Sequence, residues 1–229
     1  MAEESLKSQQ DANKAAINAL DADEIDSNPH RQGFFDAVYE NADTDPAMVP
    51  WADLAPKSQI ADWISNNPGH GKRAIDVACG LGDHAEALSD AGYQTTAFDF
   101  SQKAIDWAQK RFPGSTVDYR WGDLMNLPDE WLGTFDLVNE CYTVQSVPPP
   151  VHADIVRSIV SLLRPGGTLL VYTRTRDEGT THDGPPWPLM PSEIQFFTDA
   201  GLNVVTNLSF NVERPGRSIP HRFLCLAKE

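Results

Sequence analysis

From Lys72 to residue 229, short apolar runs alternate with segments in which apolar residues recur every three or four positions. Short apolar runs indicate buried strands, and a spacing of i, i+3, i+4 indicates a helix with one apolar face. Strands are predicted at 74–78, 94–98, 116–121, 135–139, 168–173, 203–210 and 221–227, with helices at about 83–91, 101–112, 155–163 and 192–200. Strands separated by helices form a parallel sheet covered on both faces, so the pattern predicts an α/β fold.

The first 69 residues follow a different pattern. Residues 1–27 are polar and acidic with a weak apolar helical face, whereas Phe34–Tyr39 and Ile60–Ile64 place apolar side chains at helical spacing. We therefore predict a helical N-terminal extension and lid over 1–69, followed by a sheet domain over 70–229.

The connection between the last two predicted strands is short. Only Arg214-Pro215-Gly216-Arg217 separates them. Two strands joined in this way form a hairpin, because a parallel pair needs a crossover of a dozen residues or more. One strand at this end of the sheet must therefore run antiparallel to the others.

A glycine turn follows the first predicted strand. The segment Ala74–His84 reads Ala-Ile-Asp-Val-Ala-Cys-Gly-Leu-Gly-Asp-His, a strand that runs into a tight turn and opens a helix. Gly80 and Gly82 allow the backbone to approach a ligand closely and to present amide groups to it. Taken alone, such a turn is explained equally well by the steric needs of a strand-to-helix connection.

Three further positions indicate a nucleoside ligand. Asp99 ends the second strand, 23 residues after Asp76, where a carboxylate can accept from both hydroxyls of a ribose. Asp123 can accept from the amine of an adenine, and the backbone amide of Leu124 can reach a ring nitrogen. The segment Asn139–Tyr142 ends the fourth strand at the edge where open α/β sheets bind ligands. The competing interpretation of Asp99 is a surface carboxylate that caps the next helix.

The turn departs from the dinucleotide-binding pattern GxGxxG. Ala85 occupies the third glycine position, and Asp83 lies at the opening of the helix, where its charge would repel a pyrophosphate. An adenosine without phosphates that carries a positive sulfonium fits better, and S-adenosylmethionine is such a ligand. A nicotinamide-dependent oxidoreductase and a noncatalytic nucleoside-binding domain are the alternatives.

Over residues 70–229 this set of positions resembles the class I S-adenosylmethionine-dependent methyltransferases. The resemblance implies a Rossmann-like seven-stranded, mostly parallel sheet of order 3-2-1-4-5-7-6 with strand 7 antiparallel and helices on both faces. It implies S-adenosylmethionine as cofactor and S-adenosylhomocysteine as product. The site that it implies has Asp76 and the backbone of Ala78, Gly80 and Gly82 at the methionine part, Asp99 at the ribose, Phe100 stacked on adenine, Asp123 and Leu124 at the adenine edge, and Glu140 and Cys141 near the methyl group.

A narrower resemblance concerns the predicted lid. The aromatic residues between Phe35 and Trp51 are similar to the N-terminal lid of the thiopurine, halide and tellurite-resistance methyltransferases, and Gly184–Trp187 resembles their Gly-Pro-Pro-aromatic loop. This implies a small-molecule nucleophile such as a thiol, a halide or a chalcogen. The chain departs from that subgroup at Ala78-Cys79, at His84 and in the additional residues 1–28. O- or N-methylation of a small metabolite is therefore the alternative.

The acceptor site is expected near the lid and the ends of strands four and five. Tyr142 and His182 are the candidates for catalysis, because an alcohol or amine acceptor needs a base, whereas a thiol is partly ionised near neutral pH. For most of the candidate acceptor-site residues the alternative is a side chain that only packs in the core or is exposed to solvent. The residues expected to line the acceptor pocket are Tyr39, Trp51, Arg174 and Trp187.

Composition excludes several partners. The 33 acidic and 18 basic residues give a formal net charge of −15 without a basic cluster, which disfavours nucleic acid and an anionic membrane surface. No stretch approaches the ~20 apolar residues of a membrane span, and no signal peptide is recognisable. Cys79, Cys141 and Cys225 form no CxxC pair, so no metal is expected. We predict a cytoplasmic enzyme with a small-molecule acceptor, whose oligomeric state the sequence does not indicate.

Overall fold

A computed structural model describes residues 2–20, 30–214 and 216–229 of the 229 residues. A seven-stranded sheet lies at its centre, in the order β3-β2-β1-β4-β5-β7-β6. Adjacent strands are parallel, except that β7 is antiparallel to β5 and β6. This order confirms the expected Rossmann-like sheet. The strands are β1 (Arg73–Val77), β2 (Gln94–Asp99), β3 (Asp118–Trp121), β4 (Phe135–Cys141), β5 (Leu163–Arg174), β6 (Leu202–Arg214) and β7 (Arg217–Lys228).

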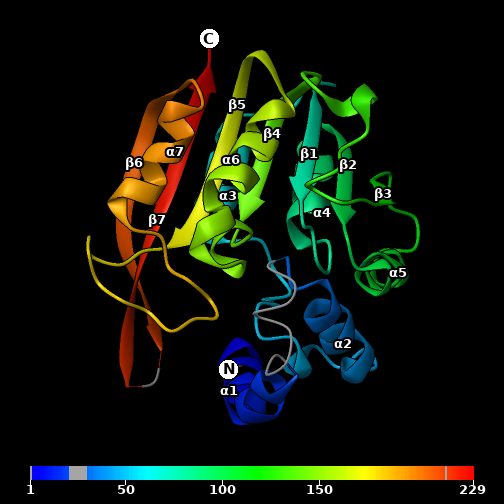
Figure 1. Cartoon of the computed structure of the whole chain (residues 1–229). Coiled ribbons are helices and arrows are strands. Elements are labelled where there is room, and N and C mark those ends of the chain that lie inside the picture. Colours follow the sequence, from blue (N-terminus) through cyan, green and yellow to red (C-terminus); the bar gives the residue numbers. More distant parts are fainter. Residues whose placement is uncertain (1, 21–29, 215) are drawn as a thin grey trace.

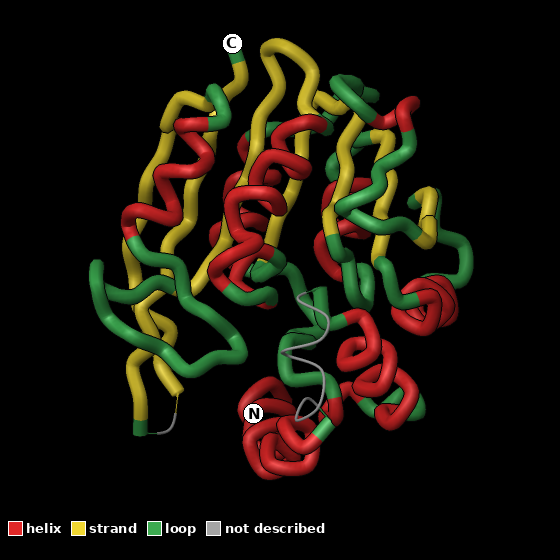
Figure 2. Tube along the Cα trace, viewed as in Figure 1, coloured by secondary structure: helices red, strands yellow, loops and turns green. Residues whose placement is uncertain are grey.

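Helices cover both faces of the sheet (Figure 2). The apolar side chains of α6 and α7 pack with Val138 and Val171 in one buried cluster, and those of α3 and α4 pack with Leu137 and Leu170 in another. The longer helices are α1 (Ala2–Ala19), α2 (Gln32–Ala42), α3 (Ser58–Asn66), α4 (Asp83–Asp90), α5 (Gln102–Arg111), α6 (His152–Ser161) and α7 (Pro191–Asp199). The short 3-10 helices are η1 (Pro46–Met48), η2 (Asp129–Trp131), η3 (Val144–Ser146) and η4 (Pro149–Val151).

The register of the central strands brings polar side chains to one edge of the sheet. Strand β1 is buried over four successive positions, Ala74–Val77, as expected for the middle of a parallel sheet that is covered on both faces. Asp76 on β1 lies beside Asn139 on β4, and Val77 lies between Phe98 and Glu140. The carboxyl ends of β1, β2 and β4 therefore meet at the same place.

The N-terminal helices lie at this edge (Figure 1). Helices α1 and α2 and the segment that follows them contribute Ile17, Phe34, Val38 and Val49 to a buried cluster that also includes Leu81 of the glycine turn. Polar contacts hold α1 in place as well: Gln10 Nε2 donates to the carbonyl oxygens of Val49 and Ala52, both at 2.8 Å. Hydrogen bonds from polar side chains therefore contribute more to the packing of α1 than an apolar helix face does. The division at residue 69 stays a prediction.

The β6–β7 hairpin is longer than the sequence pattern predicted. It extends past the end of the sheet toward α1 (Figure 1), and Arg217 near its tip donates to Asp11 on α1 at 3.0 Å. Within the described residues, no helix has the length and apolarity that a membrane span requires.

Two local features differ from expectation. Strand β5 begins at Leu163, so Pro165–Gly167, which lie outside the predicted strand at 168–173, are continuous with it; an irregular register between Phe135 and Leu137 accommodates these residues. Ser101, where the predicted helix at about 101–112 begins, is instead the residue before α5, and its side chain makes no capping hydrogen bond.

Candidate functional site

The turn after β1 has an unusual backbone. Ala78, Gly80 and Gly82 all have positive φ, at 51°, 53° and 87°. Ala78 and Gly80 line a cavity of about 320 Å³ at the carboxyl edge of the sheet. Gly82 does not line it: a Cβ there would lie 2.4 Å from the hydroxyl of Tyr119, so this glycine serves the packing of the turn. Gly80 therefore presents backbone to the cavity, whereas Gly82 is required sterically.

Asp99 lines the cavity, and a backbone amide fixes the orientation of each of its two carboxylate oxygens. Gly80 N donates to Oδ2 and Ser101 N donates to Oδ1, both at 3.0 Å. Burial raises the pKa of Asp99 to about 6, although these amides favour the charged form. Because each oxygen keeps a second lone pair, the carboxylate can still accept from a pair of ligand hydroxyls. Asp99 is therefore part of the binding wall and not a simple helix cap.

Asp76 is a second buried carboxylate at the cavity. Its Oδ1 accepts from Asn139 Nδ2 at 2.7 Å, and Oδ2 makes no hydrogen bond within the described part of the chain. Burial raises the pKa of Asp76 to about 7. A cationic group bound near Asp76 would favour its ionised form, so the position suits a ligand ammonium.

The structure weakens one argument about phosphates. Asp83 was expected to repel a pyrophosphate at the start of α4, but Arg111 donates to both of its oxygens, at 2.8 and 2.9 Å. This bidentate pair neutralises Asp83, so its charge contributes little to the cavity. Asp99, with a pKa of about 6, provides negative charge instead, and a cation bound near Asp76 would favour a second negative charge there.

Aromatic side chains from the lid close one side of the cavity. Phe35 lies 5.3 Å from Trp51 and 5.6 Å from Phe100 between ring centroids. Trp51 Nε1 donates to the hydroxyl of Tyr39 at 2.8 Å, and both side chains line the cavity. Asp123 and Leu124 line it beside these rings. This side offers flat apolar surfaces next to a carboxylate, as a purine nucleoside requires.

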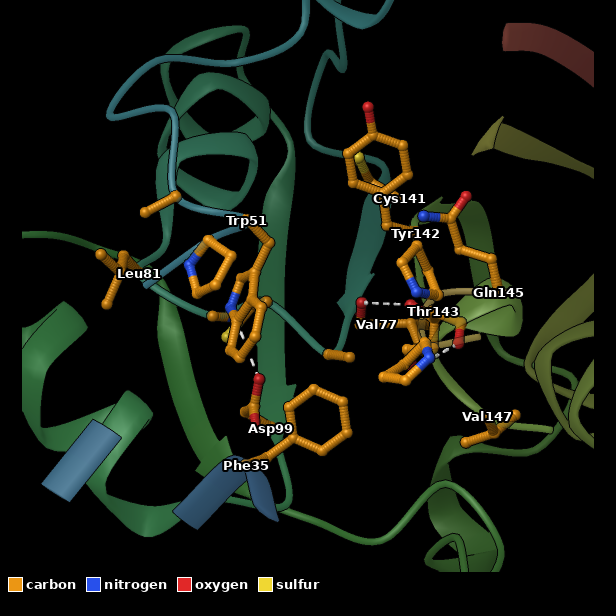
Figure 3. Close-up of a pocket in the computed structure, with 18 of the residues that line it drawn as sticks. Phe35, Trp51, Val77, Leu81, Asp99, Cys141, Tyr142, Thr143, Gln145 and Val147 are labelled. Atoms are coloured by element: carbon orange, nitrogen blue, oxygen red, sulfur yellow. Dashed lines mark hydrogen bonds between the residues drawn. The ribbon is translucent and has the colours of Figure 1, made fainter. Parts of the chain in front are cut away.

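The end of β4 forms the opposite side. Figure 3 shows Cys141, Tyr142 and Gln145 across the cavity from Asp99 and Trp51. Burial raises the pKa of the Cys141 thiol and of the Tyr142 hydroxyl, so both are protonated near neutral pH.

Four of the residues predicted for the site do not line the cavity. Gly82 packs on Tyr119 as described. Glu140 turns back to accept from the amides of Thr143 and Val144, at 2.7 and 3.1 Å. His182 is exposed and accepts from Gly184 N at 3.0 Å. Trp187 is buried outside the cavity, with its amide donating to Gln145 O at 2.7 Å.

The remaining predicted residues do line it. They are Tyr39, Trp51, Asp76, Ala78, Gly80, Asp99, Phe100, Asp123, Leu124, Cys141, Tyr142 and Arg174. Arg31 and Lys57 also line the cavity, although neither was predicted as a site residue. Arg31 Nη1 donates to the carbonyl of Ser146, which connects the lid to the segment after β4. Both residues lie within the N-terminal 69 residues. Their positive charge in a strongly acidic chain was the one feature of the sequence that could have indicated a role in binding.

Comparison with known proteins agrees with this geometry. Residues 74–167 match the sequence family described as a methyltransferase domain. Ubiquinone biosynthesis O-methyltransferase of Aromatoleum aromaticum is 32% identical over 149 residues, 64% of this chain and 62% of that protein. The enzyme of the same name from Burkholderia multivorans is 33% identical over 156 residues, 66% of this chain and 65% of that protein. The chain spans about 44–65% of the length of the curated relatives that it matches.

Solved structures show the same fold. A protein whose structure concerns conversion of a disulfide bond into a thioacetal group in echinomycin biosynthesis has a TM-score of 0.69 at 18% identity, covering 87% of this chain and 93% of that chain. The 1,6-didemethyltoxoflavin-N1-methyltransferase of Burkholderia thailandensis, with bound S-adenosylhomocysteine, has a TM-score of 0.65 at 18% identity, covering 87% of both chains. With its sheet order, its glycine turn and the match over residues 74–167, this chain has a methyltransferase domain with the fold of the class I S-adenosylmethionine-dependent methyltransferases.

Proposed function

We propose that this protein transfers a methyl group from S-adenosylmethionine to a small molecule. The observation that carries the proposal is the two-sided cavity at the carboxyl edge of the sheet. Asp99 and the backbone of Gly80 form one side, and Tyr142 and Arg174 lie at the other. A nucleoside cofactor and an acceptor would occupy adjacent parts of one enclosed space.

The residues present fit the cofactor. Asp99 would accept from the ribose hydroxyls, and Asp123 with Phe100 would bind the adenine. Asp76 would lie near the ammonium of the methionine part, and Arg31 would bind its carboxylate. The cofactor supplies a methyl carbon that is activated by its positively charged sulfur.

The work of the protein in this reaction is alignment and exclusion of water. Methyl transfer needs the acceptor atom in line with the carbon–sulfur bond, which is a problem of positioning. Phe35 and Trp51 of the lid cover the cavity with apolar surface, and Cys141 remains a neutral thiol beside it. A dry cavity favours transfer to an anionic nucleophile, because charge is neutralised as the bond forms.

An oxygen acceptor is the best supported. The curated relatives reported above are named O-methyltransferases of ubiquinone biosynthesis, and their names mention no thiol, halide or chalcogen acceptor. Tyr142 does not suit the role of base, since burial raises the pKa of its hydroxyl, and His182 lies on the exterior. We therefore infer an acceptor that is acidic enough to lose its proton to solvent before transfer.

Calorimetry with S-adenosylhomocysteine tests the cofactor. We expect binding in the micromolar range, and an Asp99→Ala variant should bind at least tenfold more weakly, because hydrogen bonds to a charged group contribute about 1.5–3 kcal/mol. Asp129→Ala, at an exposed position on η2, is the matched control. Absence of binding at millimolar ligand, or tight binding of NAD instead, would overturn the proposal.

Transfer itself needs a separate assay. Incubation with methyl-labelled S-adenosylmethionine and a panel of phenols, carboxylates, amines and thiols should give labelled product with an oxygen acceptor. Cofactor binding without turnover on any member of the panel would instead favour a noncatalytic binding domain.

A further inference from the structure

One wall of the cavity is basic in a chain that is strongly acidic overall. Lys14 on α1, Lys57 before α3, Arg174 at the end of β5 and Arg214 at the end of β6 all line the cavity. The chain has 33 acidic and 18 basic residues, so composition alone would place acidic residues there. Segments far apart in sequence contribute these cations to one place.

Among the residues that the structure describes, carboxylates neutralise only part of this positive charge. Asp53 forms ion pairs with both Lys7 and Lys57, which leaves one net positive charge among the three. Among the described residues, Lys14, Arg174 and Arg214 form no ion pair with a carboxylate. The wall therefore attracts an anion.

Arg174 has the geometry of a binding residue. Its backbone amide donates to Gln145 Oε1 at 2.6 Å, which fixes the end of β5 beside the segment after β4. Its guanidinium carbon lies 5.7 Å from the centroid of the Tyr142 ring. Its Nε is buried and makes no hydrogen bond within the described ranges. A buried N–H group without an acceptor is costly, so a ligand oxygen would satisfy it.

Two of these cations lie beside the Tyr142 ring. Lys57 Nζ is 4.6 Å from the ring centroid, and the Arg174 guanidinium carbon is 5.7 Å from it. Burial is the main cause that lowers the pKa of the adjacent His221 to about 4, and the charges of Arg174, Lys57 and Arg214 lower it further. His221 is neutral near pH 7, so it does not add to their charge.

We propose that the methyl acceptor is a small carboxylic acid whose carboxylate binds Arg174, with Lys57 and Arg214 close by. A guanidinium presents two parallel N–H groups that match a carboxylate, which gives orientation as well as attraction. The carboxylate of the cofactor would bind Arg31, which lines the cavity from the N-terminal segment. The inference rests on the proposed methyl-transfer function and names its substrate class.

Paired ligands test the inference. Wild-type protein saturated with S-adenosylhomocysteine is titrated with aromatic and aliphatic hydroxy acids, among them 3,4-dihydroxybenzoate, and with the primary amide of each. At least one acid should bind ten times or more tightly than its amide, and the difference should shrink as salt is raised from 50 to 500 mM. If no acid binds more tightly than its amide, the inference is overturned.

Variants assign the contact to Arg174. Arg174→Met should weaken binding of the preferred acid about 10–100-fold and leave its amide unchanged, with Arg174→Lys intermediate. Arg120→Met, at an exposed ion pair on β3, is the matched control. Lys14 lines the cavity but is exposed, so Lys14→Gln should fold normally and weaken binding of the acid a few-fold, which tests the basic wall without altering Arg174. Equal loss of acid and amide would contradict the assignment.

The same experiments separate this inference from the proposed function. If S-adenosylhomocysteine does not bind to the wild type, the proposed function fails. If it binds normally to both the wild type and Arg174→Met but the acids show no preference, only the carboxylate inference fails. A comparable loss of S-adenosylhomocysteine affinity in Arg174→Met would place Arg174 at the cofactor carboxylate and overturn the inference.

Discussion

The hydroxyl of Tyr142 lies 2.7 Å from Nε2 of His221, which joins the end of β4 to β7. Nδ1 of His221 lies 2.8 Å from the carbonyl of Ile219, so Nδ1 carries the proton and Nε2 accepts from the tyrosine. Burial raises the pKa of Tyr142 and is the main cause that lowers the pKa of His221. Tyr142 is thus held as a neutral donor whose ring forms part of the cavity wall.

Tyr142→Phe tests this role. The variant keeps the ring and leaves Nε2 of His221 unpaired, which should lower the free energy of unfolding by about 1–2 kcal/mol. Turnover should fall less than tenfold, whereas loss of a general base would cost about 10²–10⁴-fold. Urea unfolding and the methyl-transfer assay measure the two effects, and a loss of 100-fold or more in turnover would identify Tyr142 as a base.

Ala78 is strained in a conformation that glycine adopts freely. Its φ of 51° costs an L-residue about 1–2 kcal/mol, and a β-branched side chain tolerates it far less. Ala78→Val should therefore lower the free energy of unfolding by about 2 kcal/mol or more and weaken S-adenosylhomocysteine binding. Ala78→Gly should leave both within about 1 kcal/mol of the wild type. Equal stability of the two variants would show that the turn is not fixed as described.

The buried carboxyl of Glu140 should make stability depend on pH. Burial raises its pKa from an ordinary 4.5 to about 7. Because its folded pKa is raised, its contribution to stability is complete below about pH 4.5 and is lost as pH rises through 7. Glu140→Gln does not titrate, so its stability relative to the wild type should improve from pH 5 to pH 8 by on the order of 2–3 kcal/mol.

Chemical denaturation at both pH values measures this difference. Glu130→Gln, at an exposed position on η2, is the matched control and should show a constant difference. A constant difference for Glu140→Gln would mean that the buried carboxyl is already ionised at pH 5.

Gln10 should control how firmly α1 covers the cavity. Gln10→Ala removes the donor to the carbonyl groups of Val49 and Ala52. Amide exchange in α1 should accelerate while exchange in β4 stays unchanged, and KM for the acceptor should rise more than the Kd of S-adenosylhomocysteine. Gln9→Ala, on the exposed face, is the control. Unchanged exchange in α1 would show that its seating depends on other contacts.

The centre of the sheet could be predicted because β1, β4 and β5 contain buried, mostly apolar runs. The short run Ala74–Ala78, followed directly by Gly80 and Gly82, indicates a buried strand that ends in a tight turn. The order of the strands came from the family resemblance. The outer ends of β6 and β7 were missed, since their side chains are mostly exposed and show no apolar alternation.

The cofactor side was predicted better than the acceptor side for a physical reason. Asp99 and Gly80 follow strands directly, so their places are fixed by the sheet. Glu140 also ends a strand, but the tight turn after it offers two amides that capture its carboxylate, and sequence spacing cannot reveal that direction. Lys57 and Arg174 meet only through the packing of distant segments. Helix α1 looked weak because its buried face is polar, with Lys7 and Gln10 bound to backbone carbonyls.

The placement of α1 matters for anyone handling this protein. The two chain ends lie at opposite poles of the molecule, with α1 against the cavity and the end of β7 on the far side of the sheet (Figure 1). A purification tag or fluorescent fusion on the amino-terminal side would add bulk next to the helix that lines the cavity. The same addition on the carboxyl-terminal side would lie away from the cavity, so immobilised or labelled preparations are best built from that end.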